Sequence, residues 1–185
     1  RRVLTYAQLK HEVTRTAAAL RGLGVGKGDR VTVSMPTCLE AIVLMLACTR
    51  IGAIHSVVFA GFGAQALADR IVASGSRVVF TADITYRKGK DLPLKPIVDE
   101  ALRAPAHAVD TVVVLQRGDP TPALNADRDM SWSSFLAGAS GHSSDHESME
   151  ANEPAFILAT SGTTAKPKLA VHTHGGYQVH IVSMA

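Results

Sequence analysis

Several features that define specialised protein classes are scarce in this chain. It has 2 cysteines among 185 residues, Cys38 and Cys48, and their spacing matches neither a disulfide framework nor a pair of zinc ligands. A reducing compartment fits this composition best. The longest apolar run, 41–48, is far shorter than the roughly 20 residues that cross a bilayer, so we expect no membrane partner.

The chain also lacks a large excess of charge of either sign. The formal net charge is +3, and the basic residues are scattered rather than gathered in a stripe, so we expect no nucleic-acid partner. No secretory signal is visible, and the chain begins at Arg1 without a methionine. The expected location is therefore the cytoplasm, with a mitochondrial location left open. A content of 46% hydrophobic and 19% charged residues is ordinary for a folded domain.

Apolar segments with strand and helix character alternate along the chain. Thr5 and Gln8 form a capping box for a first helix that ends near Gly22 and Gly24. Strands are expected at 31–35, 53–59, 77–81, 111–115, 156–159 and 169–171, with helices at 37–50, 64–73 and 93–102 between them. This order predicts an α/β fold, a layered parallel-type sheet with helices on both faces. Residues 116–152 are rich in Gly, Pro, Ser, Asp and His and are expected to form a long surface excursion.

The most informative segment is the polar loop at 160–168, between the last two expected strands. It places four hydroxyls and two lysines around one glycine: Thr160, Ser161, Gly162, Thr163, Thr164, Lys166 and Lys168. Hydroxyls and free backbone N–H groups donate to phosphate oxygens, and lysines offset their charge. It is not a Walker A loop, because Ala165 precedes Lys166 and Pro167 follows it. An ordinary surface turn is the alternative.

A second basic segment consists of Arg87, Lys88, Gly89 and Lys90. Its three cations surround a glycine just past the C-terminal end of a strand, where open α/β sheets bind ligands. The residues alone leave two interpretations open, a contact to a phosphate-bearing ligand and a solvated basic loop.

Other motifs are weaker. Gly61-Phe62-Gly63 follows a strand, but Ala66 stands where the dinucleotide fingerprint needs a third glycine, so a tight turn is expected. His172 and His174 would share one side of a strand, yet no third ligand stands at useful spacing, and no metal site is predicted. The serines lack the strand-turn-helix elbow of a hydrolase nucleophile.

Two stretches resemble a known family. Residues 45–62 are similar to the corresponding run of the acetyl- and propionyl-CoA synthetases, AMP-forming members of the adenylate-forming superfamily. The loop at 160–168, followed by His172-Thr173-His174-Gly175-Gly176-Tyr177, resembles the ATP loop of the same short-chain enzymes. The resemblance runs from Thr5 to Tyr177.

This resemblance implies a two-step ligation. A short-chain carboxylate, acetate or propionate, would react with ATP to give an acyl-adenylate and pyrophosphate, and CoA would then displace AMP to give the thioester. ATP, Mg²⁺ and CoA would take part. The loop residues Thr160, Ser161, Gly162, Thr163, Thr164, Lys166 and Lys168 would close over the β- and γ-phosphates, and Arg87, Lys88, Gly89 and Lys90 would contact the phosphates of CoA.

The chain departs from the family pattern in two ways. The family usually has glycine where Ala165 and Leu169 stand, and glycine gives easier access to positive φ. In addition, the family's adenine, ribose and acyl motifs and its small C-terminal domain with the catalytic lysine would lie beyond Ala185. We therefore expect residues 1–185 to be a partial N-terminal AMP-binding domain that is inactive alone, with no catalytic residue to assign. The alternatives are a non-catalytic remnant that binds nucleotide or a partner chain, and an adenylating enzyme for another acid.

Overall fold

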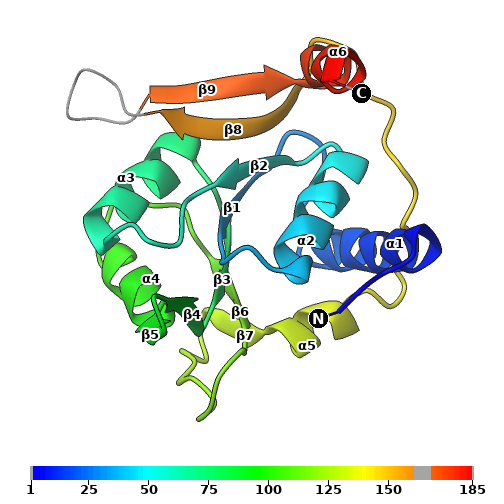
Figure 1. Ribbon diagram of the computed structural model, residues 1–185. Coiled ribbons are helices and arrows are strands. Elements are labelled where there is room, and N and C mark those ends of the chain that lie inside the picture. The colour runs from blue at the N-terminus through cyan, green and yellow to red at the C-terminus, as the bar shows by residue number, and fades with distance from the viewer. Residues whose placement is uncertain (1, 161–167, 185) are drawn as a thin grey trace.

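A computed structural model describes residues 2–160 and 168–184, which form a mainly parallel sheet with helices on both faces (Figure 1). The strand order is β7-β6-β3-β1-β2-β8-β9, and β8 and β9 pair antiparallel while the other neighbours pair parallel. The strands are β1 (Arg30–Ser34), β2 (Ile54–Val57), β3 (Val78–Ala82), β6 (Thr111–Leu115), β7 (Asp129–Ser131), β8 (Pro154–Thr160) and β9 (Lys168–Thr173). The predicted α/β class is confirmed.

Different helices cover the two faces of this sheet. They are α1 (Tyr6–Gly22), α2 (Leu39–Arg50), α3 (Ala64–Ser74), α4 (Lys95–Ala101), α5 (Trp132–Ala137) and α6 (His174–Met184). Helices α1, α2 and α5 pack on one face around Leu20, Leu44 and Phe80, and α3 and α4 pack on the other around Ile71 and Val98 (Figure 1). None of these helices, in the part of the chain that the structure describes, is long and apolar enough to cross a membrane.

Local sequence rules explain the first helix. The Thr5 hydroxyl accepts a hydrogen bond from the Gln8 N–H at 3.3 Å, and the Gln8 side chain accepts one from the Thr5 N–H at 2.9 Å. This is the predicted capping box, which satisfies two of the backbone donors left free at a helix start. The helix ends before Gly24, whose φ of 72° is the left-handed conformation that glycine adopts without strain.

Segment 116–152, expected as a surface excursion, includes two regular elements, β7 and α5. Phe135 of α5 is 1% exposed, and its ring packs edge to face on Phe80 of β3 with centroids 5.0 Å apart. Trp132 packs on the same two rings. The few apolar residues of this polar segment therefore join the core cluster that contains Phe80 of β3 and Val113 of β6.

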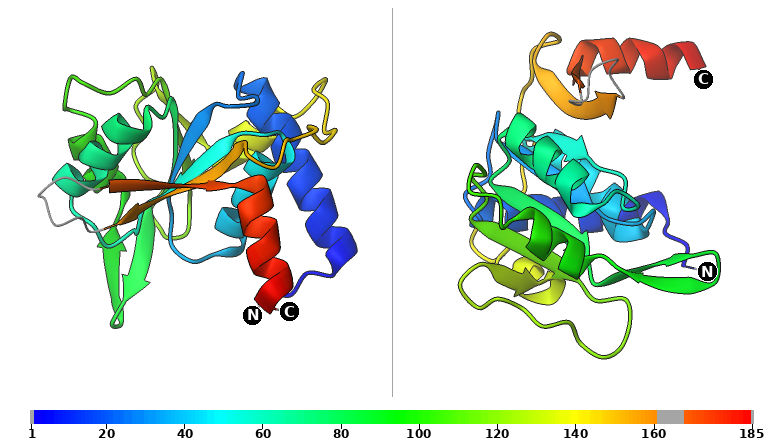
Figure 2. Two further views of the ribbon diagram at one scale, coloured as in Figure 1. Left: turned by 90° about the horizontal axis from the view of Figure 1, so that it is seen from above. Right: turned by 90° about the vertical axis from the view of Figure 1, so that its left-hand side faces the viewer.

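A two-stranded hairpin leaves the sheet directly after β3. It consists of β4 (Ile84–Arg87) and β5 (Lys90–Pro93), and it projects away from the main sheet in the right-hand view of Figure 2. Lys88 and Gly89 form its turn with φ of 51° and 75°. Two positive φ values in a two-residue loop match the twist of a hairpin. The basic segment predicted just past a strand end is thus the turn of this hairpin.

At the other edge of the sheet, rings from three strands stack in a row. His55 of β2 stacks on Phe156 of β8 with centroids 5.4 Å apart, and Phe156 stacks on His172 of β9 at 4.5 Å. His174 begins helix α6, so the prediction that it shares a strand with His172 was wrong. Gly175 and Gly176 do not prevent the helix from starting there, because the N–H of Gly176 is capped by the Thr173 hydroxyl at 3.2 Å.

Burial of His55 predicts a pH-dependent stability. Desolvation, with a smaller effect from nearby His174, lowers the pKa of His55 from 6.5 to about 4. The side chain is 7% exposed, and its Nδ1 has no hydrogen-bond partner among the described residues. Because the unfolded chain takes up this proton more readily, stability should be complete above pH 6.5 and fall by up to about 1.4 kcal/mol per pH unit as pH drops toward 4.

The measurement is urea unfolding of this chain at a series of pH values. His55→Leu should flatten the profile between pH 6.5 and 4, whereas His11→Leu, at an exposed position of α1, should leave it unchanged. An unaltered profile for His55→Leu would show that another group causes the dependence.

Candidate nucleotide site

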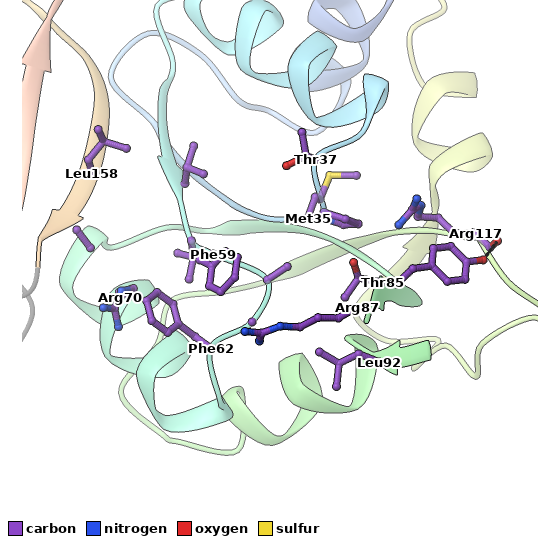
Figure 3. Close-up of a pocket in the computed structure, with 17 residues that line it drawn as sticks. Met35, Thr37, Phe59, Phe62, Arg70, Thr85, Arg87, Leu92, Arg117 and Leu158 are labelled. Atoms are coloured by element: carbon purple, nitrogen blue, oxygen red, sulfur yellow. Dashed lines mark hydrogen bonds between the residues drawn. The ribbon is translucent and has the colours of Figure 1, made fainter. Parts of the chain in front are cut away.

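The main candidate site is a cavity of about 660 Å³ at the carboxyl ends of the parallel strands. Its walls come from the segments that follow β1 and β2, from the β4–β5 hairpin, and from the end of β8 (Figure 3). Met35 and Thr37 follow β1, and Leu158 and Ala159 belong to β8. Open parallel sheets bind ligands at this edge, because the connecting segments diverge there to opposite faces.

Three arginines of the pocket are each placed against an aromatic ring. The guanidinium of Arg70 lies 4.3 Å from the ring centroid of Phe62, that of Arg87 lies 6.0 Å from Phe59, and that of Arg117 lies 5.3 Å from Tyr86. Arginine forms paired hydrogen bonds with phosphate oxygens, and aromatic faces stack with bases. In Figure 3 Arg70 and the end of Arg87 lie near Phe62, while Arg117 lies at the opposite end of the pocket.

Gly61 leaves room for the Phe59 ring and the Arg87 guanidinium to lie side by side. A Cβ at this position would lie 2.8 Å from Cζ of Phe59 and 3.1 Å from a guanidinium nitrogen of Arg87. Any larger residue would displace the Phe59 ring or the Arg87 side chain. Phe59 is 61% exposed, so its ring is available to a ligand. The Gly61-Phe62-Gly63 motif is a tight turn, as expected, and two of its residues line the pocket.

The structure distinguishes among the residues of the basic segment. Arg87 lines the pocket, whereas Lys88 and Gly89 form the exposed hairpin turn and Lys90 pairs with Arg87 across the two strands. A role for Lys88, Gly89 and Lys90 in binding CoA stays a prediction. Arg70, Arg117 and the aromatic residues were not predicted. They come from α3, from the segments after β6 and β2, and from strand β4, which the sequence alone does not bring together.

The predicted phosphate loop lies between β8 and β9 in the sequence, and the structure describes its two ends. Thr160 ends β8 and Lys168 begins β9, and the Thr160 hydroxyl donates to the Lys168 carbonyl at 3.3 Å. Ser161, Gly162, Thr163, Thr164 and Lys166 lie outside the described residues, as does Ala165. Leu169 pairs with Ala159, which lines the pocket. The end of β8, which leads into the predicted loop, therefore borders the same pocket as Arg87.

Metal-binding side chains do not gather in the described part of the chain. Within residues 2–160 and 168–184, no group of three or more His, Cys, Asp or Glu side chains is placed to hold a metal ion. His172 is stacked on Phe156, and the Nε2 atom of His174 is buried at the start of α6.

Comparison with known proteins identifies the class. The family model described as AMP-binding enzyme matches residues 1–185, so the chain belongs to the AMP-binding enzyme family. Within that family it is similar to acetyl-coenzyme A synthetases. It is 52% identical over 176 residues to the enzyme of Streptomyces coelicolor, 49% over 179 residues to that of Aeromonas hydrophila, and 48% over 180 residues to that of Yersinia pestis. These alignments cover 95–97% of the chain but 27–28% of the relatives, so the chain spans about a quarter of their length.

Proposed function

We propose that the chain supplies the CoA nucleotide pocket and the ATP phosphate loop of an AMP-forming acetyl-CoA synthetase. In this reaction an acetate oxygen attacks the α-phosphorus of ATP, giving acetyl-adenylate and pyrophosphate. The thiol of CoA then attacks the acetyl carbon, and AMP leaves. The observation that carries the proposal is the arginine- and aromatic-lined pocket bordered by the end of β8, in a chain about half identical to acetyl-coenzyme A synthetases.

Each proposed role follows from side-chain chemistry. Arg87 and Arg117 would pair with phosphate oxygens of CoA, and Phe59 would stack on its base. Thr160, Lys168 and the loop between them would donate to the β- and γ-phosphates and offset charge as pyrophosphate leaves. Mg²⁺ would enter with ATP as part of that substrate.

Carboxylate-dependent exchange of pyrophosphate into ATP tests the first step. In the complete protein that contains these residues, acetate should stimulate exchange without CoA, and adding CoA should convert the adenylate to acetyl-CoA with release of AMP. Propionate measured in parallel identifies the preferred acid. Exchange with neither acid would contradict the proposal and favour a remnant that binds ligand without chemistry, or an enzyme for another acid.

Restoring glycine in the loop is predicted to raise the exchange rate. Ala165→Gly combined with Leu169→Gly should increase acetate-dependent exchange by roughly two- to tenfold, because glycine at position 165 reaches positive φ without strain and the loss of the Leu169 side chain at the start of β9 allows closer approach to phosphate. Ala170→Gly, at the next position of β9, is the matched control and should not increase the rate. A double variant no faster than the unaltered protein would show that Ala165 and Leu169 are tolerated.

A further inference from the structure

Asp83 connects the two pocket walls that carry Arg87 and Arg117. It follows β3 directly and is 5% exposed. Its Oδ1 accepts hydrogen bonds from the backbone N–H groups of Ile84 at 2.7 Å and Arg117 at 2.8 Å, and its Oδ2 accepts one from the N–H of Gly118 at 2.9 Å. One buried carboxylate therefore holds the start of the hairpin and the segment that follows β6.

The backbone of the same residue completes the junction. The N–H of Asp83 donates to the carbonyl of Leu115 at 3.0 Å, which continues the pairing of β3 with β6. Its carbonyl accepts from the N–H of Leu94 at 2.8 Å, just after the hairpin ends. Asp83 therefore forms hydrogen bonds with residues at both ends of the hairpin and with the last residue of β6.

Direct contacts between the two walls fix their relative placement. The Tyr86 hydroxyl donates to the carbonyl of Arg117 at 3.3 Å, and the Arg117 guanidinium lies over the Tyr86 ring. Tyr86 is adjacent to Arg87 on the hairpin, so a shift of one wall moves both arginines. CoA carries a diphosphate and a separate ribose phosphate, and a rigid spacing between two cations suits a ligand with anionic groups at two places.

We propose that Asp83 is a positioning residue that sets the spacing of Arg87 and Arg117 for the nucleotide part of CoA. A carboxylate suits this position because it has two acceptor oxygens and no donor, while three N–H groups converge on it. An asparagine would place an NH₂ group against at least one of these N–H groups. This inference rests on the proposed function and names a residue that need not touch the substrate.

Asp83→Asn in the complete protein tests it through a comparison of the two half-reactions. The KM for CoA should rise about tenfold, since a misplaced pair of arginines loses charge-assisted hydrogen bonds to the ligand. Acetate-dependent ATP–pyrophosphate exchange without CoA should stay within about twofold, because that step does not use this pocket. Asp83→Glu, which keeps both acceptor oxygens, should restore part of the affinity for CoA. Asp110→Asn, an exposed aspartate at the opposite end of β6, is the matched control and should change neither value.

Three results would overturn the inference: an unchanged KM for CoA, an equal loss in exchange and CoA use, or the same effect in Asp110→Asn. If Asp83→Asn does not fold, Asp83→Glu serves the same comparison, with a smaller rise in KM and unchanged exchange expected. If the unaltered protein lacks acetate-dependent exchange, the proposed function fails instead. In that case calorimetric titration with CoA tests the role of Asp83. Asp83→Asn should bind CoA about tenfold more weakly than the unaltered protein, and equal affinities of the two proteins for CoA would contradict the inference.

Discussion

An Arg87→Ala variant of the complete protein should raise the KM for CoA by roughly ten- to a hundredfold, the range expected for losing a hydrogen bond between charged groups. Arg87 lines the pocket beside Gly61, and its guanidinium lies over the Phe59 ring. Its charge is therefore placed where a phosphate of the nucleotide would bind. Acetate-dependent ATP–pyrophosphate exchange should be nearly unchanged, because Arg87 lies outside the segment between β8 and β9 that we propose to bind the ATP phosphates. Steady-state kinetics with CoA as the varied substrate, beside exchange without CoA, gives both values.

The matched control removes a neighbouring charge of the same sign. Lys88 stands at the exposed hairpin turn, so Lys88→Ala should change the KM for CoA far less than Arg87→Ala. If the two variants behaved alike, the effect would come from the net charge of the basic segment rather than from the pocket. An unchanged KM in Arg87→Ala would place the CoA phosphates elsewhere.

The second large effect concerns stability, at a buried ion network beside the hairpin. Lys95 is 4% exposed, and its Nζ lies 2.6 Å from Asp99 and 2.8 Å from Asp129, whose side chain is fully buried. Arg128 contacts the same two carboxylates at 2.6 and 2.7 Å. Lys95→Met keeps an unbranched side chain that is one heavy atom shorter, and it leaves the buried carboxylate of Asp129 with one fewer cation. The free energy of unfolding should fall by about 1–3 kcal/mol, because Arg128 still compensates the charge of Asp129.

The pH dependence of the same network gives a second readout. Burial raises the pKa of Asp129, but hydrogen bonds from Arg128 and Lys95 outweigh it, so that the pKa lies below its ordinary value of 3.8. Stability from this group is therefore present above pH 3.8 and lost as pH falls through the lowered pKa. Lys95→Met should shift acid unfolding to higher pH, whereas Lys10→Met at an exposed position of α1 should not. Equal unfolding curves for Lys95→Met and the unaltered chain would show that the network contributes nothing.

The sequence predicted those parts of the fold that have a clear hydrophobic period. The central strands are runs of apolar residues such as 111–115, α1 has a capping box, and glycines with positive φ follow α2 and α3. Strand β7 and helix α5 were not predicted because they are short and lie within a polar segment, where Phe135 and Trp132 gain their role only by packing on Phe80. The β4–β5 hairpin was not predicted because its turn is Lys-Gly rather than the usual Asn-Gly.

The candidate site was predicted only where one segment carries its chemistry. The basic segment that contains Arg87 and the hydroxyl-rich loop that begins at Thr160 are visible in sequence because their polar groups are contiguous. Arg70 and Arg117 are single cations in unremarkable surroundings, and each becomes part of the pocket through an aromatic ring on a different segment. Asp83 likewise needs tertiary structure, since two of its three N–H donors are more than 30 residues away.

The most direct test of the account is a crystal structure of the complete protein with CoA bound. The account predicts density for the adenine nucleotide in the pocket at the carboxyl ends of β1, β2 and β8, with Arg87 and Arg117 on its phosphates and Phe59 against its base. Density for the nucleotide at any other surface of these residues, with this pocket empty, would contradict the account.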